Sequence, residues 1–157
     1  MSVTTFTTVH VIISLVGIAA GFIVLFGMVR GSFSRLWTAV FLAMTVLTSL
    51  TGFPIPPPGF DPPRAVGTLS LALLAVAVLA FYVFRLAGRW RWIYVVTATA
   101  ALYLNCFVGV IQTFQKIAFF KALAPTQSEP PFAIAQALVM LLLIGLGALA
   151  VRKFRPV

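Results

Sequence analysis

Few side chains in this 157-residue chain could carry out acid–base, nucleophilic or metal chemistry. The chain has one histidine, His10, one cysteine, Cys106, and two acidic residues, Asp61 and Glu129. A tetrahedral metal site or a two-histidine haem site needs more ligands than these, and a Ser-His-Asp triad or a carboxylate pair needs acids beside the reacting group. We therefore expect a protein that is not an enzyme and that has neither a metal nor a cofactor.

The other polar groups are mostly uncharged, and several of them follow one helical stripe. Between residues 92 and 114, Thr97, Ala101, Asn105, Gly109 and Gln112 recur at spacings of four and three, which places them on one face of a helix. An amide without a hydrogen-bond partner in hydrocarbon is strongly unfavourable. This face is therefore predicted to point into a helix bundle or a crevice rather than toward lipid.

The depth of these amides matches that of polar residues in other apolar segments. At about 1.5 Å of rise per residue, Asn105 lies level with Thr45, and Gln112 lies level with Gln136. Side chains of this kind also join membrane helices through hydrogen bonds worth about 0.6 to 2 kcal/mol each, which is the alternative interpretation. The sharper hypothesis is an outward-open crevice that binds a neutral or weakly anionic headgroup or solute. Its candidate residues are Asn105, Gln112, Gln136, Thr45, Thr48 and Ser49, with Arg64, Lys116 and Glu129 near the mouth.

Composition places these residues in a membrane protein. With 62% hydrophobic and 8% charged residues, the chain has more apolar surface than a soluble domain of its size could cover. A helix needs about 20 mostly apolar residues to cross roughly 30 Å of hydrocarbon. Five windows qualify, at residues 9–29, 36–53, 66–84, 92–114 and 132–151. Because helices satisfy their own backbone hydrogen bonds in lipid, the predicted fold is all-α, a single membrane domain of five transmembrane helices over residues 1–157.

The basic residues predict how the five spans are oriented. Short loops rich in Lys and Arg remain in the cytoplasm during insertion, and tryptophan prefers the headgroup level beside them, as at Trp37, Trp90 and Trp92. This pattern predicts an N-terminus outside and a C-terminus in the cytoplasm. The formal net charge of +9 is then distributed along membrane borders, where it meets anionic lipid headgroups rather than nucleic acid. The predicted cytoplasmic side carries Arg30, Arg35, Arg85, Arg89, Arg91, Arg152, Lys153 and Arg155, and the other side carries only Arg64, Lys116 and Lys121.

The two predicted outer connections differ in kind. Residues 54–63 contain six prolines, which favour a short, stiff, extended strap. Residues 117–123 are predicted to form a brief interfacial helix, and residues 124–131 then lead into the last span through a Pro pair. This second connection is interpreted as a turn, with a lid or docking surface as the alternative.

Small residues in the first and last spans allow helices to approach closely. Gly17 and Gly21 share one face of the first span, and Gly145 and Gly147 offer a similar surface on the last. We expect packing inside the bundle, with homo-oligomerisation through Gly17 and Gly21 as the alternative.

The second half of the chain also resembles a known group of proteins. The stretches that carry the resemblance are RWRWIYVVT at residues 89–97, Tyr103-Leu104-Asn105, Gln112, Phe114-Gln115-Lys116 and LAPTQSEPPF at residues 123–132. They are similar to an uncharacterised family of small bacterial multi-pass inner-membrane proteins, with a looser similarity over the first half. The resemblance implies a location in the bacterial inner membrane and brings no activity, substrate or residue role.

Two classes of function fit these residues. The first is a non-enzymatic membrane module that binds a lipid, a small molecule or a membrane partner subunit through the crevice. We favour this class because it needs no ionisable group inside the bilayer. The second is a small oligomeric transporter or channel for a neutral or anionic solute, although the apolar inner half of the spans offers no continuous hydrophilic path. Membrane lipids are the expected partners.

Overall fold

The computed structural model describes residues 3–55 and 62–155, and five of the helices in these ranges are long and apolar enough to cross a membrane. The prediction of an all-α fold with five membrane-spanning helices is confirmed. These helices are α1 (Val3–Arg30), α2 (Arg35–Gly52), α3 (Pro62–Val78) with its π-helical continuation η1 (Leu79–Val83), α4 (Trp90–Lys116) and α6 (Pro130–Lys153).

The helix ends follow local sequence signals. The hydroxyl of Ser34 caps α2 by accepting a hydrogen bond from the backbone N–H of Trp37 at 3.4 Å. Helix α5 (Ala118–Leu123) occupies the segment predicted as an interfacial helix, and α6 begins at the predicted Pro pair, where a missing N–H costs no hydrogen bond. Most of the predicted Pro-rich strap, residues 56–61, lies outside the described residues.

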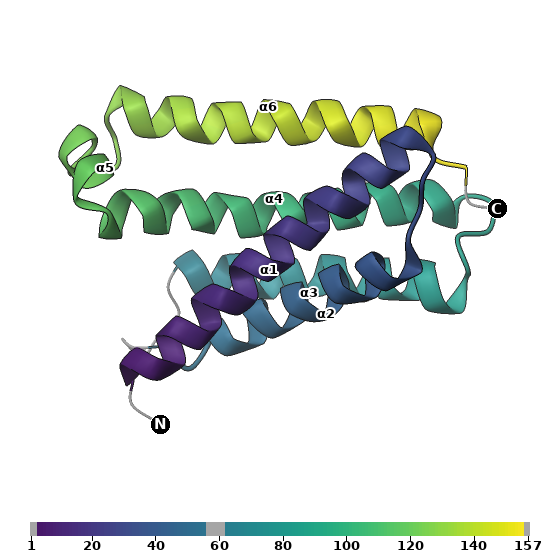
Figure 1. Ribbon diagram of the computed structural model, residues 1–157, viewed down its shortest axis with the longest axis horizontal. Coiled ribbons are helices and arrows are strands. Elements are labelled where there is room, and N and C mark those ends of the chain that lie inside the picture. Colours follow the sequence, from purple (N-terminus) through teal and green to yellow (C-terminus); the bar gives the residue numbers. More distant parts are fainter. Residues whose placement is uncertain (1–2, 56–61, 156–157) are drawn as a thin grey trace.

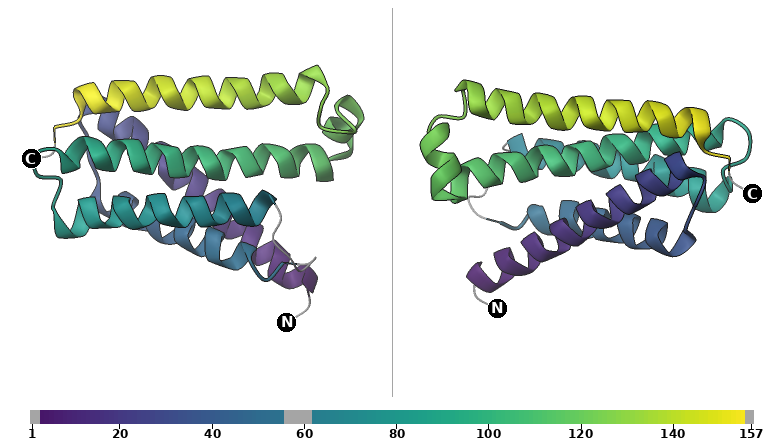
Figure 2. Two further views of the ribbon diagram at one scale, coloured as in Figure 1. Left: turned by 180° about the vertical axis from the view of Figure 1, so that it is seen from behind. Right: turned by 45° about the horizontal axis from the view of Figure 1, so that its top comes forward.

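Helix α4 is the centre of the bundle and contacts every other long helix. Helices α2 and α3 lie on one side of it and α6 on the other, while α1 crosses the bundle obliquely and contacts both α2 and α6 (Figures 1 and 2). The first turn of α1 and the last turn of α6 lie at opposite ends of the long axis (Figure 1). We call these the N-terminal end and the C-terminal end of the bundle.

The half of the bundle toward the C-terminal end is closely packed. Leu25, Met28, Phe41 and Leu102, which come from α1, α2 and α4, are each 1% exposed. The end of α6 is fixed to α4 because the guanidinium of Arg91 donates hydrogen bonds to the carbonyl of Val151 in the last turn and to that of Phe154 just after it. At this end of the bundle, the long helices therefore bury these side chains against one another rather than against lipid.

Other helix faces remain open and strongly apolar. Ile12 on α1 is 56% exposed, and Leu138 and Leu141 on α6 are 63% and 62% exposed. Continuous apolar surface of this extent is unfavourable in water and favourable in hydrocarbon. The outer faces of α1 and α6 are therefore suited to lipid.

The small residues of α1 are used inside the chain. A Cβ atom at Gly21 would lie 2.6 Å from Leu102 Cδ1, and one at Gly17 would lie 3.3 Å from Thr45 Oγ1. Both glycines are buried, so they bring α1 against α2 and α4, as expected for packing inside the bundle. The alternative was an oligomer held together through Gly17 and Gly21. Such an oligomer would need these glycines on the surface of the bundle, and both are buried.

Candidate functional site: a cavity between helices α1 to α4

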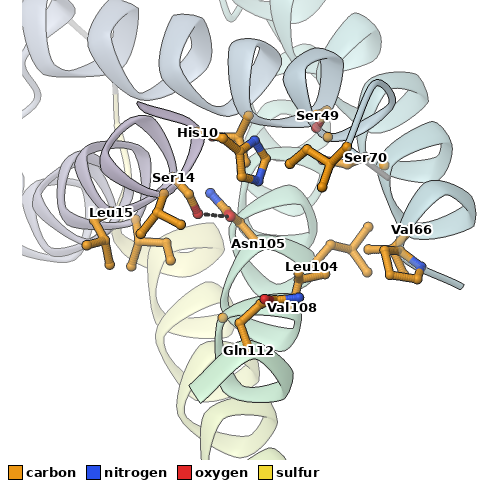
Figure 3. A pocket seen from close by; sticks show the side chains of 18 of the residues that line it. His10, Ser14, Leu15, Ser49, Val66, Ser70, Leu104, Asn105, Val108 and Gln112 are labelled. Carbon is orange, nitrogen blue, oxygen red and sulfur yellow. Dashed lines mark hydrogen bonds between the residues drawn. The ribbon is translucent and has the colours of Figure 1, made fainter. Parts of the chain in front are cut away.

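A cavity of about 700 Å³ opens between α1, α2, α3 and α4 toward the N-terminal end of the bundle (Figure 3). Ligand-binding pockets in proteins commonly enclose roughly 300 to 1,000 Å³ and combine apolar walls with a few polar groups. This cavity has that composition: its apolar wall includes Leu15, Ile18, Leu104 and Val108, which alternate along α1 and α4 with polar residues. It is large enough for a polar head group together with part of an apolar chain.

After Ser70, which is 4% exposed, Asn105 is the most deeply buried polar residue that the structure describes in the cavity wall, at 7% exposed. Its Oδ1 accepts a hydrogen bond of 2.9 Å from the hydroxyl of Ser14, so α1 and α4 are joined at this depth (Figure 3). Its Nδ2 is buried without a hydrogen-bond partner in the described part of the chain. A buried donor without a partner costs about 1 to 3 kcal/mol, and such a group calls for an explanation.

His10 lies one turn before Ser14 on α1 and also lines the cavity. Its Nδ1 lies 2.8 Å from the hydroxyl oxygen of Thr51 near the end of α2. Figure 3 shows the imidazole beside the Ser14–Asn105 pair, on the side toward Ser49 and Ser70. Polar groups from all four helices therefore meet in one space.

Six of the nine predicted site residues line this cavity. Thr48 and Ser49 lie on α2, and Asn105 and Gln112 lie two turns apart on α4, as the stripe predicted. The two cations are at the rim. The guanidinium of Arg64 ties the start of α3 to the end of α2 by donating hydrogen bonds to the carbonyls of Phe53, at 3.1 Å, and Ile55, at 2.7 Å. Lys116 is exposed in the last turn of α4.

The other three predicted residues lie elsewhere. Thr45 is level with Asn105 but is packed beneath the cavity against Gly17, and its hydroxyl donates to the carbonyl of Phe41 at 2.8 Å. The amide of Gln136 donates to the carbonyl of Phe107 at 3.2 Å, which joins α6 to α4 rather than to the cavity. Depth was therefore predicted correctly for Thr45, whereas the position of Gln136 around the bundle was wrong because α6 packs away from α2 and α3.

Glu129 lies outside the cavity, in the turn before α6. Its carboxylate accepts hydrogen bonds from the backbone N–H groups of Thr126 and Ser128, each at 3.1 Å, and from the hydroxyl of Thr126 at 2.9 Å. Slight desolvation opposes ionisation, but these hydrogen bonds favour the charged form and lower the pKa of Glu129 below its usual value. The carboxylate thus organises its own loop, and placing it at the mouth was wrong.

Four residues that line the cavity were not predicted as site residues: His10, Ser14, Ser70 and Thr113. A signal for two of them was present, because His10, Ser14 and Gly17 recur at spacings of four and three on α1. This is the same kind of polar and small-residue stripe that identified the face of α4.

The charged side chains that the structure describes around the cavity are all basic. Arg64 and Lys116 are at its rim, and none of the described residues that line it is acidic. Such a site favours an anionic or neutral ligand over a cation. The parts of the chain that the structure describes contain no cluster of three or more His, Cys, Asp or Glu side chains that could hold a metal ion.

The cavity does not continue through the bundle. Below Asn105, α1 packs so closely on Leu102 and Phe41 at Gly21 that no side chain fits between them. Comparison with protein-family models, with curated proteins and with solved structures finds no match to this chain.

Proposed function

We propose that this chain is a non-enzymatic protein of the bacterial inner membrane that binds the polar end of a lipid-like amphiphile in the cavity between α1 and α4. The observation that carries the proposal is the cavity itself: about 700 Å³ walled by apolar and uncharged polar side chains inside a bundle of membrane-spanning helices. A soluble ligand would not need the apolar wall, and a bare hydrocarbon chain would not need the polar one.

The position of the rim cations supports a ligand that enters from the membrane surface. Lys116 ends α4 at the level where the membrane-spanning segment stops. With the orientation that the basic residues predict, this rim lies on the outer side of the membrane. The proposed ligand would then place its head among the polar groups and extend its chain along the apolar wall.

A transporter or channel is the second candidate, but in this conformation the close packing below the cavity leaves no path for a solute. Leu102 and Phe41 are each 1% exposed and close the space between α1, α2 and α4. Transport would require these buried side chains to separate, whereas binding requires no such movement. We therefore favour binding.

Two glycine variants form a matched test. Gly109 lines the cavity on α4, with Ile18 Cδ1 as the nearest atom at 3.7 Å from a built Cβ, whereas Gly145 on α6 has nothing within 4 Å. Native mass spectrometry of the protein released from lipid nanodiscs should detect a retained amphiphile in the wild type and in Gly145→Leu. Gly109→Leu should lose it because the new side chain occupies the cavity.

A wild-type protein that retains no amphiphile under these conditions contradicts the proposal. Solute flux in liposomes that is abolished in Asn105→Leu and Gln112→Leu would instead favour the transporter. Flux that is absent from all proteins, together with amphiphile lost only from Gly109→Leu, supports binding.

A further inference from the structure

Three hydroxyl groups in the cavity wall can accept hydrogen bonds but have no proton to give to a ligand. Thr48 donates its proton to the carbonyl of Met44 at 2.8 Å, Ser49 to that of Thr45 at 3.0 Å, and Thr113 to that of Gly109 at 2.8 Å. Each hydroxyl has a single proton, which is thus committed to its own helix. What these residues leave for a ligand is lone pairs.

The position of the single hydroxyl proton of Thr51 likewise assigns the tautomer of His10. The hydroxyl of Thr51 donates to the carbonyl of Leu47 at 2.7 Å, with the carbonyl of Thr48 as a second, longer partner at 3.3 Å. With the Thr51 proton on the carbonyl of Leu47, the 2.8 Å contact with His10 is assigned as donated by the imidazole Nδ1–H. In the neutral ring, the other nitrogen, Nε2, then carries a lone pair, which adds a further acceptor to the wall of the cavity.

One buried donor complements these acceptors. Because the hydroxyl of Ser14 already occupies Oδ1 of Asn105, the amide has only its Nδ2 protons left, and Nδ2 has no partner in the described ranges 3–55 and 62–155. Asn105 is 93% buried, since 7% of it is exposed, and it lines the deep end of the cavity. Nδ2 itself is covered by the chain, close to Gly17, so a ligand oxygen reaches it when the Asn105 side chain turns toward the cavity and then satisfies a group that the chain leaves without a bond.

We infer that the head group bound in this cavity is a hydroxyl, on an uncharged amphiphile such as a long-chain alcohol or a glycerol-headed diacyl lipid. A hydroxyl donates one hydrogen bond and accepts others, so it can give its proton to the Nε2 of His10 and accept from the Nδ2 of Asn105. A ketone, ester or ether has no proton for the acceptor-rich wall. This inference rests on the proposed binding function and adds the chemistry of the head.

A carboxylate or phosphate head fits the deep end poorly despite the basic rim. Lys116 and Asn105 are eleven residues apart on α4, which corresponds to about 16 Å along the helix axis. Arg64 is engaged by two backbone carbonyls at the end of α2. An anion beside Asn105 would be far from Lys116 and would meet the lone pairs of the threonine and serine hydroxyls.

Three photoreactive probes that differ only at the head provide the test. They share a sixteen-carbon chain carrying a diazirine and end in a hydroxyl, a methyl ether or a carboxylate. Each is added to the protein in nanodiscs of zwitterionic lipid, and labelled peptides from α1 and α4 are quantified by mass spectrometry. We expect the alcohol to label the cavity peptides about tenfold more than the ether, equivalent to about 1.4 kcal/mol.

The variants connect this selectivity to the proposed atoms. His10→Phe and Asn105→Leu should reduce the preference for alcohol over ether toward unity. Thr51→Val leaves the cavity wall in place but removes the acceptor that holds the tautomer, so it should weaken the preference without abolishing labelling. Thr97→Val is the control, because Thr97 donates to its own helix at the carbonyl of Ile93 and does not line the cavity.

The outcomes separate this inference from the function on which it rests. Equal labelling by alcohol and ether, or stronger labelling by the carboxylate, overturns the hydroxyl head while leaving amphiphile binding intact. A preference for alcohol that survives in both His10→Phe and Asn105→Leu also overturns it. If none of the three probes labels the cavity peptides above those of α6, the proposed function fails as well.

Discussion

Replacing Gly21 by alanine tests the close packing that closes the bundle beneath the cavity. The added Cβ would lie 2.6 Å from Leu102 Cδ1 and 2.9 Å from two atoms of the Phe41 ring. Both neighbours are 1% exposed, and the empty space beside them, about 10 Å³, is too small to take a displaced leucine side chain or phenylalanine ring. Overpacking of a core costs about 1 to 3 kcal/mol, and replacing glycine by alanine in a helix returns about 0.5 to 1 kcal/mol, which leaves a net destabilisation of about 1 kcal/mol.

The other glycines supply a graded series for the same measurement. A Cβ at Gly147 would meet Thr99 Cγ2 at 3.0 Å, one at Gly17 would meet Thr45 Oγ1 at 3.3 Å, and one at Gly145 would meet nothing within 4 Å. The free energy of unfolding of the alanine variants should therefore increase in the order 21, 147, 17, 145. Gly145→Ala should be at least as stable as the wild type because it gains helix propensity without a clash.

Reversible unfolding in mixed micelles gives these free energies, and a double-mutant cycle checks their cause. Leu102→Val shortens the side chain that meets the new methyl group, so it should be less destabilising in the Gly21→Ala background than in the wild type. Equal stability of Gly21→Ala and Gly145→Ala would refute the reasoning, as would strict additivity of the Gly21 and Leu102 substitutions.

Three further predictions concern the rim, the α5–α6 turn and the membrane orientation. Arg64→Gln should release the end of α2, so amide exchange of residues 51–55 should become about tenfold faster while exchange in α6 is unchanged. Because the pKa of Glu129 is lowered, the order that its carboxylate gives to the turn should be present above the usual carboxyl range and be lost as pH falls through the lowered pKa. The protection factors of the Thr126 and Ser128 amides, corrected for the intrinsic pH dependence of exchange, should follow this change in the wild type and stay constant in Glu129→Gln. Reporter fusions should place the N-terminus outside and the C-terminus in the cytoplasm, and both ends in one compartment would contradict the orientation derived from the basic residues.

The fold was predictable because its causes are local and additive along the chain. Length and apolar composition identify a membrane span without knowledge of its neighbours, and the five predicted windows each fall on one long helix. The short helix α5 and the start of α6 at Pro130 also follow from local signals. The stripe through Asn105 and Gln112 identified a face of α4 because helical periodicity fixes which residues point the same way.

The site was only partly predictable because depth does not determine the angular position of a helix. Gln136 was predicted at the depth of Gln112, yet it hydrogen-bonds to the carbonyl of Phe107 on α4, away from the cavity. Which side of α4 receives α6 depends on contacts along the whole lengths of three helices, and no short pattern encodes it. His10 was not predicted as a site residue because nothing in the sequence around it reveals Thr51, forty-one positions away.

The placement of α6 has a consequence for biosynthesis. All the lining residues that the structure describes precede α5, from Thr7 on α1 to Ile117 after α4. A nascent chain that has inserted its first four spans already contains the complete pocket, while the fifth is still in the ribosome or the translocation channel. If the proposed binding function holds, an amphiphile can enter during synthesis and support the early four-helix assembly, and the arrival of α6 completes the lipid-facing wall without altering the groups proposed to hold the ligand.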